Sequence, residues 1–242
     1  MNIKKTTLTL MAALLYSGAY AGSDYYYPDA GWVPAKKVKW GKPASEEVGE
    51  KVLKNVAKKS HVHYKYLNHY AAGSDKNGVK TIHAHDQKHG RHMGKFAFNT
   101  IKSGGSEVYY GEWNGNEYVK GKNRGVFYSG DKRATNMPMS GTATYNVKGI
   151  NNYNGNNQLH GQLHADFGKR TLTGSMKNSA VKMDIYSHIK PHKASFKGHA
   201  VANGHYGKTE GHFFGNGASS LAGVTKFKTN HNLDTAFGGT KK

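Results

Sequence analysis

The stretch at residues 134–176 reads ATNMPMSGTATYNVKGINNYNGNNQLHGQLHADFGKRTLTGSM, and it has the pattern of a β-meander. Near its centre, apolar and polar side chains alternate, with Leu159, Leu163, Ala165 and Phe167 on one side and His160, Gln162, His164 and Asp166 on the other. A period of two is typical of a strand with one buried face. After a turn at residues 168–170, Leu172, Gly174 and Met176 resume the inward face. We therefore expect an antiparallel sheet to organise the chain.

The same pattern extends in both directions from this stretch. Residues 142–147 alternate in the same way, and the Asn/Gly-rich residues 151–157 indicate a loop. Further strands are expected at residues 107–113, 124–129, 181–185, 194–202 and 212–214, with the last at 221–228. About eight short strands suffice for a closed up-and-down barrel. The glycines and aromatic residues favour a small barrel filled by side chains.

The N-terminus has the features of a secretory signal peptide. Lys4 and Lys5 precede the apolar run of residues 8–16, and Ala19-Tyr20-Ala21 provides small-x-small residues for cleavage. The chain contains no cysteine, so we expect neither disulfides nor a lipid anchor. We interpret the mature chain as a secreted or periplasmic bacterial protein without a membrane anchor.

The composition is strongly basic, with 35 Lys+Arg against 15 Asp+Glu and a formal charge of +20. Such a balance favours acidic partners, although dispersed lysines are also typical of a solvated surface. We expect no nucleic-acid partner, because the chain carries an export signal and no recognised binding module. We also expect no enzyme, because no nucleophile–base pair stands out. Glu46, Glu47 and Glu50 fit the first turn of a helix expected at residues 43–57.

The middle of the chain is rich in histidine and tyrosine. The candidate metal ligands are His61, His63, His69, His83, His85, His89 and His92, and the nearby candidates for packing and charge are Tyr64, Tyr66, Tyr70, Lys65 and Arg91. Imidazole binds haem iron and late transition metals, and aromatic rings suit a porphyrin.

The spacing of these histidines bears on the choice of metal. On a strand, His61 and His63 would share a face about 7 Å apart, and so would His83 and His85. A haem with two axial histidines needs ligands from two separated segments, whereas a same-face pair with a third group suits zinc. A polar, basic surface without a metal remains the alternative for each histidine.

Three segments of the chain resemble barrel motifs of the transferrin-binding protein B family. They are residues 136–145 (NMPMSGTATY), 165–174 (ADFGKRTLTG) and 210–223 (EGHFFGNGASSLAG), in the order in which that family has them. Within this superfamily, a short chain without a lipidated cysteine and with a His/Tyr-rich N-terminal part is similar to the hemophilin-type secreted haemophores.

The resemblance implies a mainly β fold, in which a small N-terminal α+β clamp domain precedes a C-terminal eight-stranded antiparallel β-barrel. The expected divisions are residues 1–21 for the signal peptide, 22–102 for the clamp and 103–242 for the barrel. It further implies binding of haem b taken from host haemoproteins such as haemoglobin, export by a Slam translocator, and delivery to a TonB-dependent outer-membrane receptor. Two alternatives stay open: a surface factor that binds a host protein without haem, and a zinc carrier.

Overall fold

The computed structural model describes residues 25–26, 33–34, 67–68, 71, 73–85, 92–114 and 124–242. The expected signal peptide and the helix expected at residues 43–57 lie outside these residues. Two short strands, β1 (Tyr25–Tyr26) and β2 (Val33–Pro34), pair with each other. In the part of the chain that is described, no helix is both long and apolar enough to cross a membrane.

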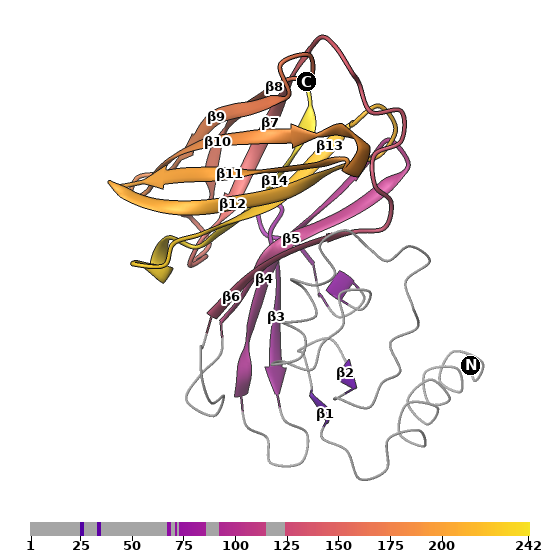
Figure 1. Ribbon diagram of the computed structural model, residues 1–242. Helices are drawn as coiled ribbons and strands as arrows, with labels where there is room; N and C mark the ends of the chain where they lie inside the picture. Colours follow the sequence, from indigo (N-terminus) through magenta and orange to yellow (C-terminus); the bar gives the residue numbers. More distant parts are fainter. Residues whose placement is uncertain are drawn as a thin grey trace, which may run out of the picture.

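The C-terminal part is a closed eight-stranded antiparallel barrel (Figure 1). Its strands are β7 (Thr142–Ile150), β8 (Leu159–Asp166), β9 (Thr171–Lys177), β10 (Lys182–Lys190), β11 (Ser195–Ala202), β12 (His205–Phe214), β13 (Ser220–Lys226) and β14 (Thr235–Lys241). A 3-10 turn, η1 (Pro191–Lys193), joins β10 to β11, and η2 (His231–Leu233) precedes β14. Each strand pairs with the next in sequence, and β14 pairs with β7 to close the ring. The predicted up-and-down barrel is thus confirmed.

Aromatic side chains fill the barrel interior. The Phe213 ring lies 5.8 Å from Tyr145, 5.9 Å from Phe167 and 5.5 Å from Phe196, measured between ring centroids. Phe237 lies 6.1 Å from Phe196 and is fully buried. These rings occupy the space that a wider barrel would leave for a ligand. The barrel is therefore a packed scaffold.

The alternation in the sequence predicts the barrel faces correctly. Along β8, Leu159, Leu163 and Ala165 are buried while His160 and His164 are exposed. The prediction that the last strand lies at residues 221–228 is wrong, because β14 follows β13. The sequence of β14, TAFGGTK, carries two adjacent glycines, which weaken the strand signal.

A second, four-stranded sheet precedes the barrel. It consists of β3 (Lys80–His85), β4 (His92–Ser103), β5 (Ser106–Asn114) and β6 (Arg124–Gly130), in that order. The strands expected at residues 107–113 and 124–129 form, but they belong to this sheet and not to the barrel. The reason is that pairing of β14 with β7 closes the barrel and leaves no free edge to receive them.

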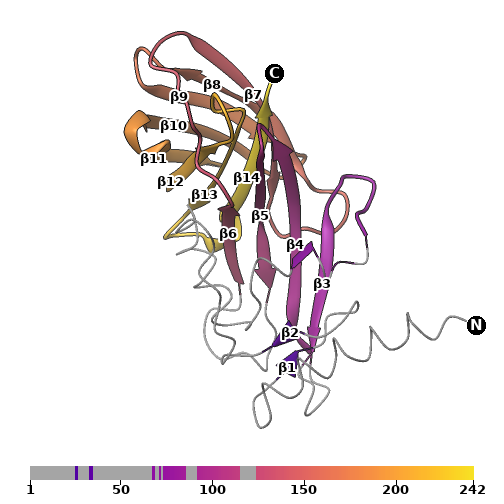
Figure 2. The same ribbon diagram turned by 90° about the vertical axis from the view of Figure 1, so that its right-hand side faces the viewer.

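The sheet packs with one face on the outside of the barrel, against β13 and β14 (Figures 1 and 2). Tyr110 and Tyr128 of the sheet share a buried cluster with Phe214 and Val224 of the barrel. Glycine permits a close approach, since a Cβ atom at Gly238 would lie 2.6 Å from the Tyr110 ring. The barrel thereby holds the sheet rigidly from one side.

Candidate functional site

The face of the sheet turned away from the barrel carries five aromatic side chains, which we call the aromatic face. They are Phe96, Phe98, Tyr109, Trp113 and Phe127, and each is buried. Residues that stand opposite each other on paired strands share a face of the sheet. Phe96 stands opposite Trp113, and Phe98 and Phe127 both stand opposite Gly111, one from each side. The rings of Phe96 and Phe127 meet edge to face, with centroids 6.1 Å apart. The result is a broad apolar wall.

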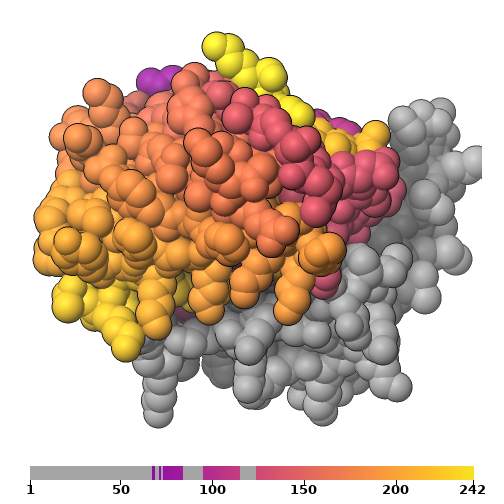
Figure 3. Space-filling model, turned by 45° about the horizontal axis from the view of Figure 1, so that its top comes forward, coloured from indigo at the N-terminus to yellow at the C-terminus, as the bar shows by residue number. Residues whose placement is uncertain are grey.

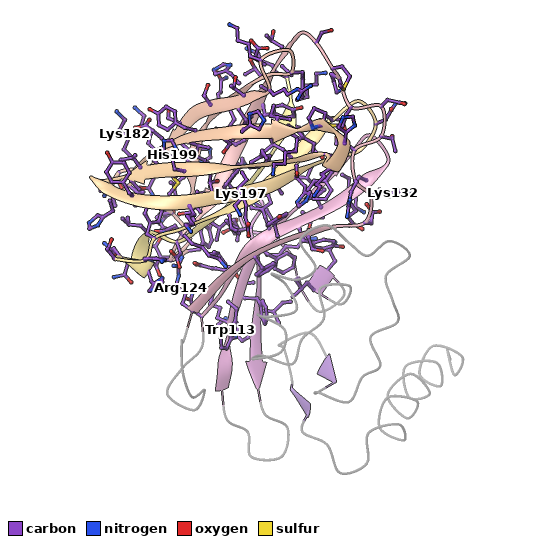
Figure 4. The ribbon with its side chains drawn as sticks, viewed as in Figure 1. Trp113, Arg124, Lys132, Lys182, Lys197 and His199 are labelled. Atoms are coloured by element: carbon purple, nitrogen blue, oxygen red, sulfur yellow. The ribbon has the colours of Figure 1, made fainter. Side chains whose placement is uncertain are left out.

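Trp113 adds an unusual polar group to this wall. It lies on β5, below the barrel in Figure 4, and its side chain is fully buried. Its indole Nε1 has no hydrogen-bond partner in the described part of the molecule. A buried donor without a partner costs free energy, so such groups often mark functional sites.

One short helical segment is anchored at the edge of the aromatic face. The Asn68 amide donates to Glu107 Oε1 at 2.9 Å and to the Tyr109 hydroxyl at 3.0 Å. The side-chain oxygen of Asn68, Oδ1, accepts from Lys80 Nζ at 2.6 Å and from Thr100 Oγ1 at 3.1 Å. Leu67 beside it is fully buried. This anchor lies in the chain between the candidate ligands His63 and His69.

Three of the candidate ligands lie on described strands, at the end of the sheet that carries the β3–β4 connection. His83 and His85 are on β3, and His92 begins β4, where its backbone is the register partner of His85. A register shift between Ala84 and His85 interrupts the pairing. Such a bulge breaks strict alternation, which the expected shared face of His83 and His85 assumes. The β3–β4 hairpin therefore brings the backbones of these histidines together, but the register does not determine the direction of their side chains.

The other candidates lie outside the described residues. They are His61, His63, His69 and His89, together with Tyr64, Tyr66, Tyr70, Lys65 and Arg91. Among the described residues, no group of three or more His, Cys, Asp or Glu side chains is placed to hold a metal ion. The roles of these residues in binding a metal or haem stay predictions.

A buried ion pair fixes the sheet to the barrel loops. The side chain of Glu112 is fully buried and accepts from Arg124 Nη2 at 2.6 Å and Nε at 3.1 Å. It also accepts from the backbone N–H groups of Asn152 at 2.9 Å and Tyr153 at 2.6 Å. Arg124, labelled in Figure 4, donates in turn to the carbonyl oxygens of His231 and Asp234. We call this group the Glu112 clasp.

A second polar contact between the sheet and the barrel involves a histidine that the sequence analysis did not select. His212 of β12 meets Tyr128 of β6, whose hydroxyl lies 2.9 Å from its Nδ1. Burial lowers the pKa of His212 to about 3, and the charge of Arg133 contributes in the same direction. His212 is therefore neutral at physiological pH. Its sequence neighbourhood, in the motif at residues 210–223, signals only barrel structure.

The described residues fit the apolar part of a haem. A porphyrin requires aromatic and aliphatic walls, donors for its carboxylates and imidazole for its iron. The aromatic face supplies such a wall, Trp113 an unpaired donor, and the β3–β4 hairpin several histidines.

Two family models match the chain. The model of the HphA N-terminal heme-binding domain matches residues 29–125, and the model of the HphA C-terminal domain matches residues 135–241. The first match contains all seven candidate histidines and the aromatic face except Phe127. The second contains all eight barrel strands.

Among solved structures, the chain is similar to HpuA from Kingella denitrificans in complex with human haemoglobin. The TM-score is 0.49 at 20% identity, and the alignment covers 59% of this chain and 55% of that one. The apo structure of the same haemoglobin receptor gives 0.47 at 14% identity, covering 68% and 83%. Transferrin-binding protein B from Actinobacillus pleuropneumoniae gives 0.44 at 18% identity, covering 60% and 80%. The chain spans about half the length of the HpuA chain in the haemoglobin complex.

Proposed function

This chain belongs to the HphA family, and from that membership we propose that it is a secreted haemophore. In this proposal it captures haem b, taken from host haemoproteins such as haemoglobin, and delivers it to a TonB-dependent outer-membrane receptor. Export through a Slam translocator completes the route. In this proposal the protein acts by binding, without catalysis and without a nucleic-acid partner.

The observation that carries the proposal is the match of residues 29–125 to a haem-binding domain. The aromatic face supports it, because five buried aromatic side chains on one side of a sheet form a wall of the kind that a porphyrin requires. The barrel supports it indirectly. Its interior is filled, so a ligand of this size is more easily accommodated beside the sheet.

Several residues of this chain would hold the haem. The candidate axial ligands are His61, His63, His69, His83, His85, His89 and His92. Tyr64, Tyr66, Tyr70, Lys65 and Arg91 are the candidates for contacts with the porphyrin and its carboxylates. The bound iron would supply coordination positions for one or two imidazoles. The indole N–H of Trp113 would serve as an additional donor inside the pocket.

The test is a titration of the purified mature protein with haemin, followed by visible absorption. We expect a shifted Soret band that saturates at one haem per chain, and one or two of the seven His→Ala variants should abolish it. Exposed barrel histidines provide matched controls, since His188→Ala and His192→Ala should leave the spectrum and the stoichiometry unchanged. The wild-type spectrum in the ferric and ferrous states would distinguish one axial imidazole from two.

A spectrum that remains that of free haemin would refute the proposal. Retention of haem binding by all seven variants would refute the assigned ligands while leaving haem binding itself intact. Metal analysis of the same preparation tests the zinc alternative, and recovery of a serum protein by colourless protein tests the alternative of a host-protein binder.

A further inference from the structure

A groove lies between the sheet and the barrel, away from the aromatic face. Its volume is about 690 Å³. One wall comes from β4 and the turn before β3, and the other from the outer surfaces of β7, β8 and β14. None of the residues that line it is acidic. The lining therefore contributes no negative charge that would repel an anion.

Seven of the side chains that line the groove carry an amide or a hydroxyl group: Asn77, Asn99, Thr100, Tyr110, Asn146, Gln162 and Thr240. Gln162 Nε2 donates to Asn146 Oδ1 at 3.0 Å on the barrel wall. On the opposite wall, Asn99 Nδ2 donates to the Tyr110 hydroxyl at 3.0 Å. These bonds hold the side chains in fixed positions and leave each amide with further donors or acceptors. Such a lining suits a ligand rich in hydroxyl groups.

A line of basic residues continues from the groove across the barrel wall, and we call it the basic row. Lys148 is the register partner of His160, His160 that of Lys177, and Lys177 that of Lys182. All four side chains are exposed, and Lys148 and His160 also line the groove. None of the four has an ion pair among the described residues. Figure 3 shows barrel atoms, mostly orange, as open surface on the face turned to the viewer, and Figure 4 labels Lys182, the member of the row on β10.

The basic row has a cost that a bound anion would remove. Lys177 and Lys182 stand directly opposite each other, and like charges in such a pair destabilise a sheet. Adjacent strands lie about 4.8 Å apart, so the row spans roughly 14 Å from β7 to β10. Asp184, the acidic residue on β10, lies two residues beyond Lys182, opposite Ser175. A linear ligand with a negative charge at each repeat would match this line.

We propose that the groove and the basic row together form a binding site for an extended acidic polysaccharide. The hydroxyl groups of the sugar would meet the amides of the groove, and its sulfate or carboxylate groups would lie along the basic row. Polar side chains and cations in one continuous path favour this ligand over a single-stranded nucleic acid, which stacks its bases on aromatic side chains. The inference does not rest on haem binding.

The test measures binding of a heparin octasaccharide to the full mature chain at physiological salt. The variant Lys148→Gln/Lys177→Gln/Lys182→Gln should weaken binding about 10-fold, as expected from the loss of three exposed ion pairs. The control variant replaces Lys190, Lys193 and Lys197, also exposed, by glutamine and lowers the net charge equally. It should change the affinity less than about 2-fold. Gln162→Glu, which places a negative charge in the groove, should also weaken binding.

Three results would overturn the proposal. The first is no binding of the octasaccharide by the wild-type chain. The second is an equal loss in the test and control triple variants, which would indicate attraction by net charge alone. The third is binding of single-stranded DNA of the same charge as tightly as the octasaccharide, which would indicate a general polyanion surface. Circular dichroism of each variant excludes a folding defect as the cause of lost binding.

Discussion

Replacement of Glu112 by alanine should destabilise the protein more than any surface change. The Glu112 carboxylate is fully buried and accepts four hydrogen bonds, two from Arg124 and two from backbone N–H groups. Its loss leaves a guanidinium that is only 16% exposed without its partner, and two amide donors unpaired. Removing one member of a buried ion pair costs about 3–5 kcal/mol. We expect a loss of about 4 kcal/mol, a shift of roughly 2 M in the urea midpoint of a protein this size.

The three tryptophans make the assay selective. Trp32, Trp40 and Trp113 all precede the barrel strands, so tryptophan fluorescence reports on the N-terminal part and circular dichroism on both parts. In the Glu112→Ala variant the fluorescence transition should occur at a lower urea concentration than the circular dichroism transition. The reason is that the Glu112 clasp joins the sheet to the barrel loops, so its loss should let the sheet unfold first.

The matched control is Lys102→Gln on the neighbouring strand β4. The Lys102 side chain is 77% exposed and its Nζ lies 3.5 Å from Glu107, so this change should cost less than about 0.5 kcal/mol. A loss below about 1 kcal/mol in the Glu112→Ala variant would refute the reasoning, because it would mean that water or other groups replace the carboxylate without cost.

Three further predictions concern the interior and the sheet–barrel contact. The pKa of His212 is lowered from 6.5 to about 3 in the folded protein. Between these two pH values the unfolded chain binds a proton that the folded protein does not bind. The free energy of unfolding should therefore fall on acidification, by up to about 1.4 kcal/mol per pH unit. Urea titrations from pH 7.5 to 4 should show a weaker dependence for His212→Gln, and an unchanged slope would contradict the assignment. Phe213→Ala should cost about 3–5 kcal/mol in denaturant unfolding, against less than about 0.5 kcal/mol for Tyr206→Ala, whose side chain is 77% exposed. Gly238→Val should push the Tyr110 ring off the barrel and lower the free energy of unfolding, measured by tryptophan fluorescence, by about 1–3 kcal/mol. An unchanged free energy of unfolding would show that the contact adapts.

Prediction from the sequence succeeded where the signal is local. The alternation of Leu159, Leu163 and Ala165 with exposed histidines identifies both the strand and its buried face. Prediction failed for β14, because its glycines carry no alternation, and for the partner choice of β5 and β6, because strand pairing joins residues far apart in the chain. The site divides in the same way. The histidines are visible as a composition, whereas the shared face of Phe96 and Trp113 requires the register of β4 and β5.

By itself the sequence determined a mainly β chain with an alternating, filled barrel and a histidine-rich segment before it, since periodicity and composition are properties of neighbours in the chain. Only the tertiary structure decided which strands leave the barrel for a separate sheet. It also decided that Glu112 is buried against Arg124, and that Lys148, His160, Lys177 and Lys182 form one line. The physical reason is that hydrogen-bond partners and burial depend on which distant segments meet, and ring closure between β14 and β7 settles this for every other strand.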